Sequence, residues 1–124
     1  MTMTRAGRIT LAMPVYNVEK YVERALLSAL NQDYDNLDIV VVDDKGKDSS
    51  MDIVRRVVAT HQRGNDVRII EHESNMGLGA TRNTAIDNAE GEYIIFMDSD
   101  DYITDDCISK LYSSVIDNGS DMVV

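Results

Sequence analysis

Three carboxylates in four positions give this sequence its most distinctive chemistry. Asp98, Asp100 and Asp101 directly follow an apolar run at residues 93–97. Closely spaced carboxylates repel one another unless a cation offsets their charge. Their oxygens are the hard ligands that Mg²⁺ and Mn²⁺ prefer, so the stretch predicts a divalent-metal site. The alternative is a solvated acidic turn before the next helix, which is common in a chain with 22 Asp and Glu residues.

Alternating apolar segments predict the scaffold that positions these carboxylates. Short apolar or β-branched runs indicate strands, and apolar residues at helical spacing indicate helices. We expect strands at residues 9–13, 37–42, 67–70 and 93–97, the last buried on both faces. Pro14 should end the first strand, since proline cannot donate to a sheet ladder. We expect helices at about 19–31, 48–63, 77–89 and 104–118, and the start of another strand at 121–124. This order predicts an α/β fold: an open, mostly parallel sheet with helices on both faces.

Parallel strands end at one edge of a sheet, so the residues that follow them converge there. Tyr16 could present its ring to a planar base, or be an ordinary rim tyrosine. Asp44 could accept a hydrogen bond from a base or ribose, or simply begin a turn. Arg82 suits a phosphate through its forked guanidinium, or is an exposed helix residue. Gly77 leads into a helix and could let a ligand approach the backbone closely.

Composition limits the classes of function. The 124 residues suit one domain, with residues 1–8 as a flexible leader and 9–124 as the folded part. The net charge of -10 disfavours nucleic acids and anionic membranes as partners. Cys107 is the only cysteine, so no internal disulfide can form and a cytoplasmic setting is the default. The apolar runs are too short to span a membrane, so contact with the inner membrane face would need segments outside this chain.

Several other chemistries lack their motifs. The sequence contains no P-loop and no G-x-S-x-G nucleophile elbow. No G-x-G-x-x-G follows the first strand, which weakens a dinucleotide-binding interpretation. The chain has two histidines, His61 and His72, without metal-ligand spacing, and we expect both to be surface residues.

Four motifs in order resemble the inverting glycosyltransferases of family 2, which have the GT-A fold. The motifs are Pro14-Val15-Tyr16-Asn17; Val42-Asp43-Asp44 with Asp48 and Ser50; Asn75-x-Gly77 with Ala80-Thr81-Arg82-Asn83; and Gly91-Glu92-Tyr93 leading into Asp98-Ser99-Asp100-Asp101. Each motif is weak alone, but together they cover the chain from about Ile9 to its end.

The resemblance implies an enzyme that transfers a sugar from a nucleotide-sugar donor, most often a UDP-sugar, with inversion. The acceptor would be a hydroxyl of a glycan or a lipid-linked molecule. A divalent metal, Mn or Mg, would bridge the donor pyrophosphate to Asp98, Asp100 and Asp101. Asp100 is the expected direct ligand, with Asp101 as the alternative. The implied donor-binding residues are Pro14, Val15, Tyr16, Asn17, Glu19, Asp44, Arg82, Asp98 and Ser99.

Two departures from the family pattern matter. The family usually has Gly-Ser-Thr after the aspartate pair, whereas this chain has Lys45-Gly46-Lys47. The family's catalytic base lies in an acceptor-binding half, and no matching segment follows Asp101. We therefore expect the base beyond Val124 and interpret the chain as the donor-binding part of a truncated domain.

Two other functions stay open at this point. A signalling receiver domain has a similar length and an acidic metal pocket, but its acidic pair follows its first strand. A catalytically inactive nucleotide-binding module would keep the donor site without turnover.

Overall fold

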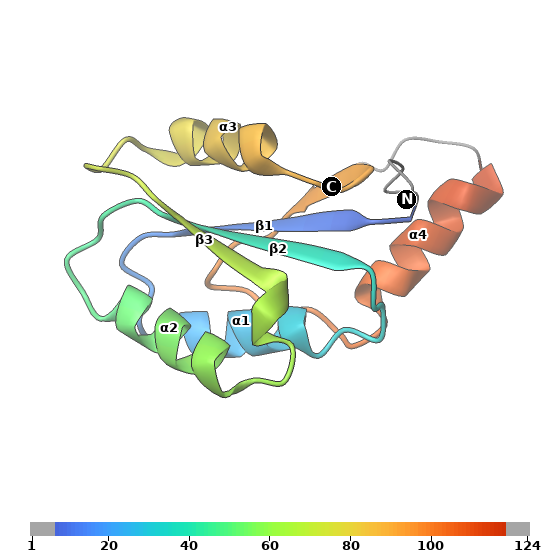
Figure 1. Cartoon of the computed structure of the whole chain (residues 1–124), viewed down its shortest axis with the longest axis horizontal. Coiled ribbons are helices and arrows are strands. Elements are labelled where there is room, and N and C mark those ends of the chain that lie inside the picture. Colours follow the sequence, from blue (N-terminus) through green and yellow to red (C-terminus); the bar gives the residue numbers. More distant parts are fainter. Residues whose placement is uncertain (1–6, 119–124) are drawn as a thin grey trace.

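A four-stranded parallel sheet forms the centre of the computed structural model, which describes residues 7–118. The strands are β1 (Ile9–Val15), β2 (Leu37–Asp43), β3 (Val67–Glu71) and β4 (Tyr93–Phe96), in the order β3-β2-β1-β4. Figure 1 shows the loops after β1, β2 and β3 leaving the same end of the sheet. Residues 1–6 of the predicted leader at 1–8, and the predicted strand at 121–124, lie outside the described residues.

Helices cover both faces of this sheet, as the sequence predicts. The helices are α1 (Val22–Leu30), α2 (Ser50–Thr60), α3 (Leu78–Asn88) and α4 (Cys107–Asn118), with a short 3₁₀ turn η1 (Gly64–Asp66). Helices α1 and α2 lie on one face and α3 on the other, with α4 at one end of the molecule (Figure 1). The α/β fold class is confirmed.

The two faces of β1 build two apolar cores. Toward α1 and α2, Ile9, Leu11 and Met13 are fully buried. Toward α3, the smaller Ala12 packs in one cluster with Ala85. Burying each large aliphatic side chain contributes roughly 1.5–3 kcal/mol. The larger core therefore lies between the sheet and the α1–α2 layer.

Strand β1 continues through Pro14, although the sequence predicts that this proline ends it. Ala12 O accepts a hydrogen bond from Met97 N (2.8 Å), and Val15 O accepts one from Asp44 N (3.0 Å). Peptide groups alternate sides along a strand, so the missing N–H of Pro14 faces the β4 side. Pairing with β4 ends at Ala12 and Phe96. No ladder bond is therefore lost, and the strand tolerates the proline.

Strand β4 is less buried than predicted. It lies at one edge of the described sheet and pairs with β1. Within Tyr93–Phe96 only Ile95 is fully buried. The expectation of burial on both faces is wrong for this strand, because an apolar sequence does not reveal whether a strand is central or at an edge.

Most helix boundaries shift by a few residues from their predicted positions. Helix α1 begins at Val22 rather than near residue 19. Helix α2 begins at Ser50, and the side chain of Asp48 accepts its backbone N–H at 3.0 Å. Ser49, at the N-cap position of α2, makes no side-chain cap hydrogen bond.

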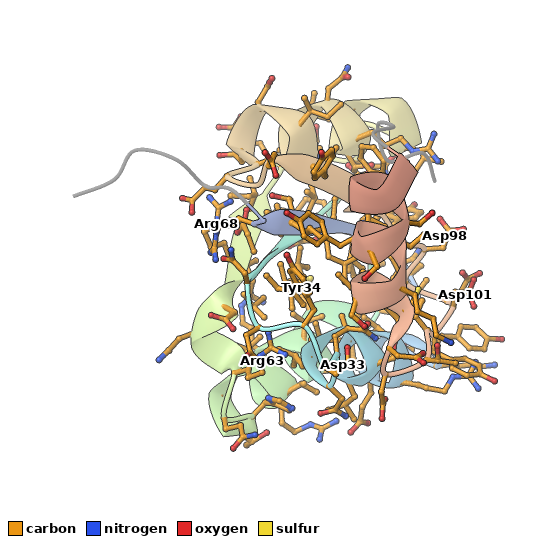
Figure 2. The ribbon with its side chains drawn as sticks, turned by 90° about the vertical axis from the view of Figure 1, so that its right-hand side faces the viewer. Asp33, Tyr34, Arg63, Arg68, Asp98 and Asp101 are labelled. Atoms are coloured by element: carbon orange, nitrogen blue, oxygen red, sulfur yellow. The ribbon has the colours of Figure 1, made fainter. Side chains whose placement is uncertain are left out.

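Arg63 closes the carboxyl end of α1 from a distant loop. Its guanidinium donates to the carbonyl oxygens of Leu30 (3.2 Å) and Gln32 (2.9 Å), and to that of Tyr34 (3.1 Å). Its Nε also pairs with Asp66 at 3.3 Å. The last carbonyls of a helix lack partners within the helix, and a cation there also interacts favourably with the helix dipole. Arg63 and Tyr34 lie on the α1–α2 side of the sheet (Figure 2).

Asp38 is the centre of a second group of polar contacts, at the amino ends of the strands. Its carboxylate is 1% exposed and accepts hydrogen bonds from Thr10 Oγ1 (2.9 Å) and from Arg68 Nε (2.9 Å). The backbone N–H of Glu90 donates to it as well, at 3.0 Å. Burial raises the pKa of Asp38, but the hydrogen bonds from Arg68, Glu90 and Thr10 outweigh it and hold the pKa below the usual value.

Replacing Arg63 with methionine keeps an apolar stem but removes every donor. The carbonyls at the end of α1 then lose their partners, so we expect the free energy of unfolding to fall by about 2–4 kcal/mol. Urea denaturation measures this loss. Arg55→Met is the control, because Arg55 is 47% exposed and pairs with Glu71. It should cost less than about 1 kcal/mol. Equal losses in both variants would contradict the role of Arg63.

The lowered pKa of Asp38 predicts a stability that depends on pH. Its contribution is present above the unfolded-state pKa of about 3.9 and is lost as the pH falls through the lower folded-state pKa. Asp38→Asn should therefore be less stable at pH 7 and lose less stability below about pH 4. The slopes should differ by at most about 1.4 kcal/mol per pH unit. Denaturation at several pH values tests this, and parallel acid slopes would refute it.

Candidate functional site

A cavity of about 380 Å³ lies at the carboxyl ends of the strands. Its walls come from the segments after all four strands, and β1 and β4 flank the point where the strand order reverses. Open α/β sheets bind ligands at such a switch point. The lining residues are Pro14, Tyr16, Val18, Asp44, Asn75, Gly77, Leu78, Thr81, Asp98, Ser99 and Asp100. The predicted convergence of distant polar clusters is thus present in the fold.

The loop after β1, which contributes Tyr16 and Val18 to the cavity, is interlocked with the loop after β2. Asn17 Oδ1 accepts a hydrogen bond from Lys47 N at 2.8 Å, and Asp48 Oδ2 accepts one from Glu19 N at 3.0 Å. A Cβ on Gly46 would approach Asn17 Oδ1 to 2.5 Å, so glycine permits the close contact of the two loops. Lys45 has a φ of 56°, where the family pattern has glycine. At this departure from the family pattern, Lys45 therefore adopts a left-handed conformation that glycine adopts more readily.

The carboxylate of Asp44 holds the part of the cavity wall that the loop at 75–77 forms. Asp44 is 3% exposed. Its Oδ1 accepts from His72 Nδ1 (2.9 Å) and Met76 N (2.9 Å), and its Oδ2 accepts from Asn75 Nδ2 (3.0 Å) and Gly77 N (3.0 Å). Burial raises the pKa of Asp44, but these hydrogen bonds, led by that from His72, hold it below the usual value. The ionised carboxylate therefore fixes the loop at 75–77 from which α3 begins.

Gly77 is required by its backbone. Its φ of 93° lies in the left-handed region, where a side chain is strained. A Cβ there would meet no atom of the described residues within 4 Å. Glycine is therefore required here by the backbone conformation and not by lack of space. The open space beside it is part of the cavity.

His72 is a buried residue, contrary to the prediction of a surface histidine. It is 8% exposed, and its ring lies between Asp44 and Thr84, with Nε2 at 2.7 Å from Thr84 Oγ1. His61 is partly buried as well, and its Nε2 lies 2.9 Å from Asn31 Oδ1. The prediction is wrong for His72, because it considered only metal-ligand spacing and not the side chains that the fold brings near.

The acidic turn after β4 divides its carboxylates between two hollows. Asp98 and Asp100 line the cavity, whereas Asp98 and Asp101 line a neighbouring groove that also contains Arg82. Asp101 Oδ1 accepts a hydrogen bond from Tyr102 N at 2.8 Å. In Figure 2 Asp98 and Asp101 lie toward the right edge of the sheet and Arg68 toward the left, in keeping with the edge positions of β4 and β3. Within residues 7–118 no three His, Cys, Asp or Glu side chains form a metal-binding group.

A two-carboxylate metal site still fits this arrangement. Mg²⁺ is commonly held by one or two carboxylates together with substrate phosphates and water. Asp98 and Asp100 supply two such carboxylates at one cavity. The third predicted ligand, Asp101, does not line it.

Some of the other predicted donor-binding residues line the cavity and others do not. Val15, Asn17, Glu19 and Arg82 lie outside the cavity lining: Val15 is 1% exposed in the core, and Arg82 stacks over Phe96. Sequence reasoning did not select Val18, Asn75, Leu78 and Thr81 as site residues, although all four line the cavity. Asn75 follows β3 closely, and that position relative to a strand end is the signal that could have identified it.

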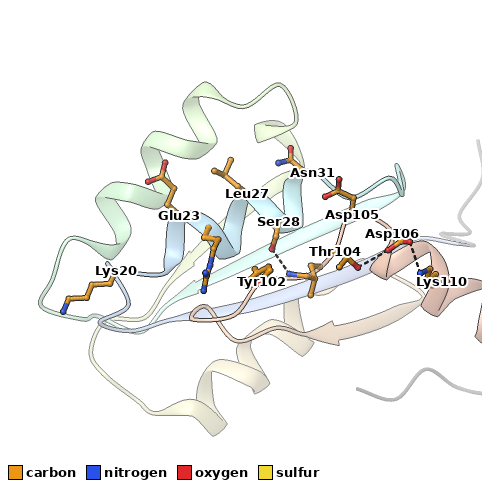
Figure 3. Close-up of a pocket in the computed structure, with 12 residues that line it drawn as sticks. Lys20, Glu23, Leu27, Ser28, Asn31, Tyr102, Thr104, Asp105, Asp106 and Lys110 are labelled. Carbon is orange, nitrogen blue, oxygen red and sulfur yellow. Dashed lines mark hydrogen bonds and ion pairs between the residues drawn. The ribbon is translucent and has the colours of Figure 1, made fainter.

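A larger groove of about 1130 Å³ lies between α1 and the segment 102–106 (Figure 3). Arg24 stacks on Tyr102 at 4.4 Å from the ring centroid. Ser28 accepts a hydrogen bond from Ile103 N at 3.2 Å, and Lys110 pairs with Asp106. The groove contains none of the carboxylates of the acidic turn or of Asp44. Its size alone does not make it the site.

Comparison with known proteins places the chain in one family. The model of "Glycosyl transferase family 2" matches residues 10–124. The glycosyltransferase GlyA of Streptococcus pneumoniae is 40% identical over 117 residues, which cover 94% of this chain and 16% of GlyA. The chain spans less than half the length of the curated relatives it matches.

Two solved structures share the fold. The fragment 1–349 of S. aureus TarS in complex with UDP-GlcNAc has a TM-score of 0.82 and 32% identity, covering 91% of this chain and 32% of that one. The mannosyltransferase PcManGT from Pyrobaculum calidifontis, in complex with GDP-Man and Mn²⁺, has a TM-score of 0.80 and 29% identity, covering 87% and 32%. In the part of this chain that the structure describes, no helix is long and apolar enough to cross a membrane.

The hydrogen bonds of Asp44 predict that its amide variant is unstable. In Asp44→Asn an NH₂ group replaces one oxygen and faces two of the four donors. We expect a loss of about 2–5 kcal/mol in the free energy of unfolding, measured with urea. Asp43→Asn is the matched control. Asp43 is also buried, but its carboxylate accepts from Lys45 N through Oδ1, which an amide oxygen can replace. Similar losses in both variants would contradict the organising role of Asp44.

Proposed function

The chain belongs to glycosyltransferase family 2, and on that premise we propose that it binds a nucleotide-sugar donor in the cavity at the strand ends. The proposal extends to transfer of the sugar to an acceptor hydroxyl with inversion, in a longer protein of which residues 9–124 form the donor-binding domain. A UDP-sugar is the proposed donor, and a glycan or a lipid-linked molecule the proposed acceptor. A cytoplasmic location remains part of the proposal.

The negative charge of the cavity is the observation that supports a bound metal. Three aspartates line it, and no Lys, Arg or His is among its described lining residues. A diphosphate placed there would face carboxylates without any compensating positive side chain. A divalent cation between the two resolves the repulsion. When bound, Mn or Mg would also supply Lewis-acid stabilisation of the diphosphate leaving group.

The chain's own residues would hold the two ends of the donor. Asp98 and Asp100 would hold the metal on the diphosphate side. Tyr16 is 45% exposed at the cavity and can offer its ring to the base. To accept the predicted hydrogen bond from the base, Asp44 would have to use an oxygen that already accepts two bonds. We therefore assign Asp44 mainly to shaping the wall against which the base rests.

The proposed reaction is a direct displacement. An acceptor oxygen forms the new bond to the anomeric carbon as the bond to the nucleoside diphosphate breaks, and a general base takes the acceptor proton. Such a base typically contributes about 10²–10⁴-fold to the rate. We place it beyond Val124, so the present chain should bind the donor and turn it over poorly.

Two alternatives are separated by different observations. The family match disfavours a receiver domain, and Pro14 and Tyr16 occupy the positions at the end of β1 where a receiver has its acidic pair. An inactive nucleotide-binding module would bind the donor equally well. Sugar transfer by the longer protein would exclude it, whereas donor binding without transfer would favour it.

Calorimetry with UDP, with GDP and with or without Mn²⁺ tests the donor site. We expect UDP binding that depends on Mn²⁺ and is weakened about tenfold or more by Asp100→Asn, which corresponds to roughly 1.4 kcal/mol. Asp101→Asn is the control, because Asp101 lies outside the cavity lining. It should stay within about threefold of the wild type, or about 0.7 kcal/mol. Metal-independent affinity that is equal in the wild type and Asp100→Asn would refute the metal assignment.

A further inference from the structure

His72 links three parts of the molecule at the back of the cavity. It directly follows β3, and its backbone N–H donates to Asp43 O at 2.9 Å. Its ring joins Asp44, at the end of β2, to Thr84 on α3. Because His72 is 8% exposed, these contacts lie mostly away from solvent. A residue in this place can couple the strand ends to the helix that borders the cavity.

The proton positions follow from the partners. An ionised carboxylate only accepts hydrogen bonds, so the proton on the Asp44 side must be on Nδ1 of His72. In the neutral ring, Nε2 is then the acceptor for the hydroxyl of Thr84. Each ring nitrogen therefore has one partner, and the imidazole is held from both sides. A carboxylate–imidazole pair fixed in this way resists rotation of either side chain.

The orientation of Asp44 determines the shape of the loop at 75–77. Two backbone N–H groups, those of Met76 and Gly77, donate to its carboxylate, one to each oxygen. A rotation of that carboxylate would break both bonds at once. Gly77 and Asn75 line the cavity, whereas His72 does not. Any influence of His72 on a ligand must therefore pass through a neighbour, and of its two ring partners only Asp44 lines the cavity.

We infer that His72 is a positioning residue for the donor cavity: its imidazole, braced by Thr84, orients Asp44 so that Asp44 holds the loop at 75–77 in its binding shape. The consequence for the donor rests on the proposed function, but the positioning itself does not. The sequence-derived assignment of His72 to the surface hid this role, because nothing in the spacing of His72 and Thr84 shows that they meet.

Two variants, H72N and H72Q, distinguish the contribution of Nδ1 from that of Nε2. Asparagine places an amide near Nδ1 and keeps a donor for Asp44, whereas glutamine places its amide near Nε2 and keeps a partner for Thr84. Backbone hydrogen exchange of Met76 and Gly77 is measured first, without nucleotide. We expect H72Q to speed exchange at these two amides by about tenfold or more relative to H72N, since about 1.4 kcal/mol is a factor of ten. Exchange within α2 serves as the internal reference.

Affinity for UDP with Mn²⁺ then tests the consequence for binding. H72Q should bind about tenfold more weakly than H72N, while the two variants melt at similar temperatures. A merely structural histidine would lower stability in both and would not separate their affinities. Equal exchange at Met76 and Gly77 in the two variants overturns the inference. If the wild type binds no nucleotide, the proposed function fails and the exchange comparison still decides the positioning role.

Thr84→Val provides the decisive measurement if both His72 variants unfold. Valine has nearly the shape of threonine and removes only the hydroxyl that braces Nε2. Faster exchange at Met76 and Gly77, with unchanged exchange in α2, supports the inference. Unchanged exchange at both amides overturns it.

Discussion

The carboxylate of Asp44 is the interaction on which the cavity depends. Four donors converge on its two oxygens from the segment that joins β3 to α3, and the group is almost fully buried. A buried charge is tolerated only when its hydrogen-bonding capacity is filled, so the loop must adopt the shape that supplies these donors. The wall of the cavity is thereby fixed before any ligand arrives, which lowers the entropy cost of binding.

A second constraint acts on the part of the wall that follows β4. Asp98 and Asp100 face the cavity without a cationic side chain among the described lining residues. Nearby Arg82 stacks over Phe96 in the adjacent groove. The site thus combines the saturated carboxylate of Asp44, which is structural, with two carboxylates that accept no hydrogen bond from the described residues and can accept a cation. This difference in hydrogen bonding, rather than the number of aspartates, separates the residues that shape the site from those proposed to hold the metal.

Local patterns in the sequence predicted the scaffold because they record burial and periodicity. The runs that became β1 to β4 and the apolar stripes of the helices gave the parallel sheet, and the sheet alone implied that Asp44 and Asp100 would share an edge. The prediction that Pro14 ends the first strand was wrong, because the effect of a proline depends on which neighbouring strand its missing N–H would face.

The finer details of the site depend on tertiary contacts that no short pattern contains. His72 and Thr84 meet only because α3 packs on β1 and β2, so that Thr84 comes within hydrogen-bond distance of the residue after β3. Asp100 and Asp101 are neighbours in sequence, yet the turn sends one toward the cavity and the other toward the next groove. The family resemblance identified segments that line the cavity. Which residues of these segments face the cavity could be seen only in the structure.

A two-dimensional NMR titration of the ¹⁵N-labelled chain with UDP and Mg²⁺ tests most directly whether the strand ends form the ligand site. The largest shifts should appear at the amides of Tyr16, Gly77 and Ser99, which come from three separate loops around one cavity. Shifts concentrated instead on Ser28, Tyr102 and their neighbours, in the groove beside α1, would contradict the account.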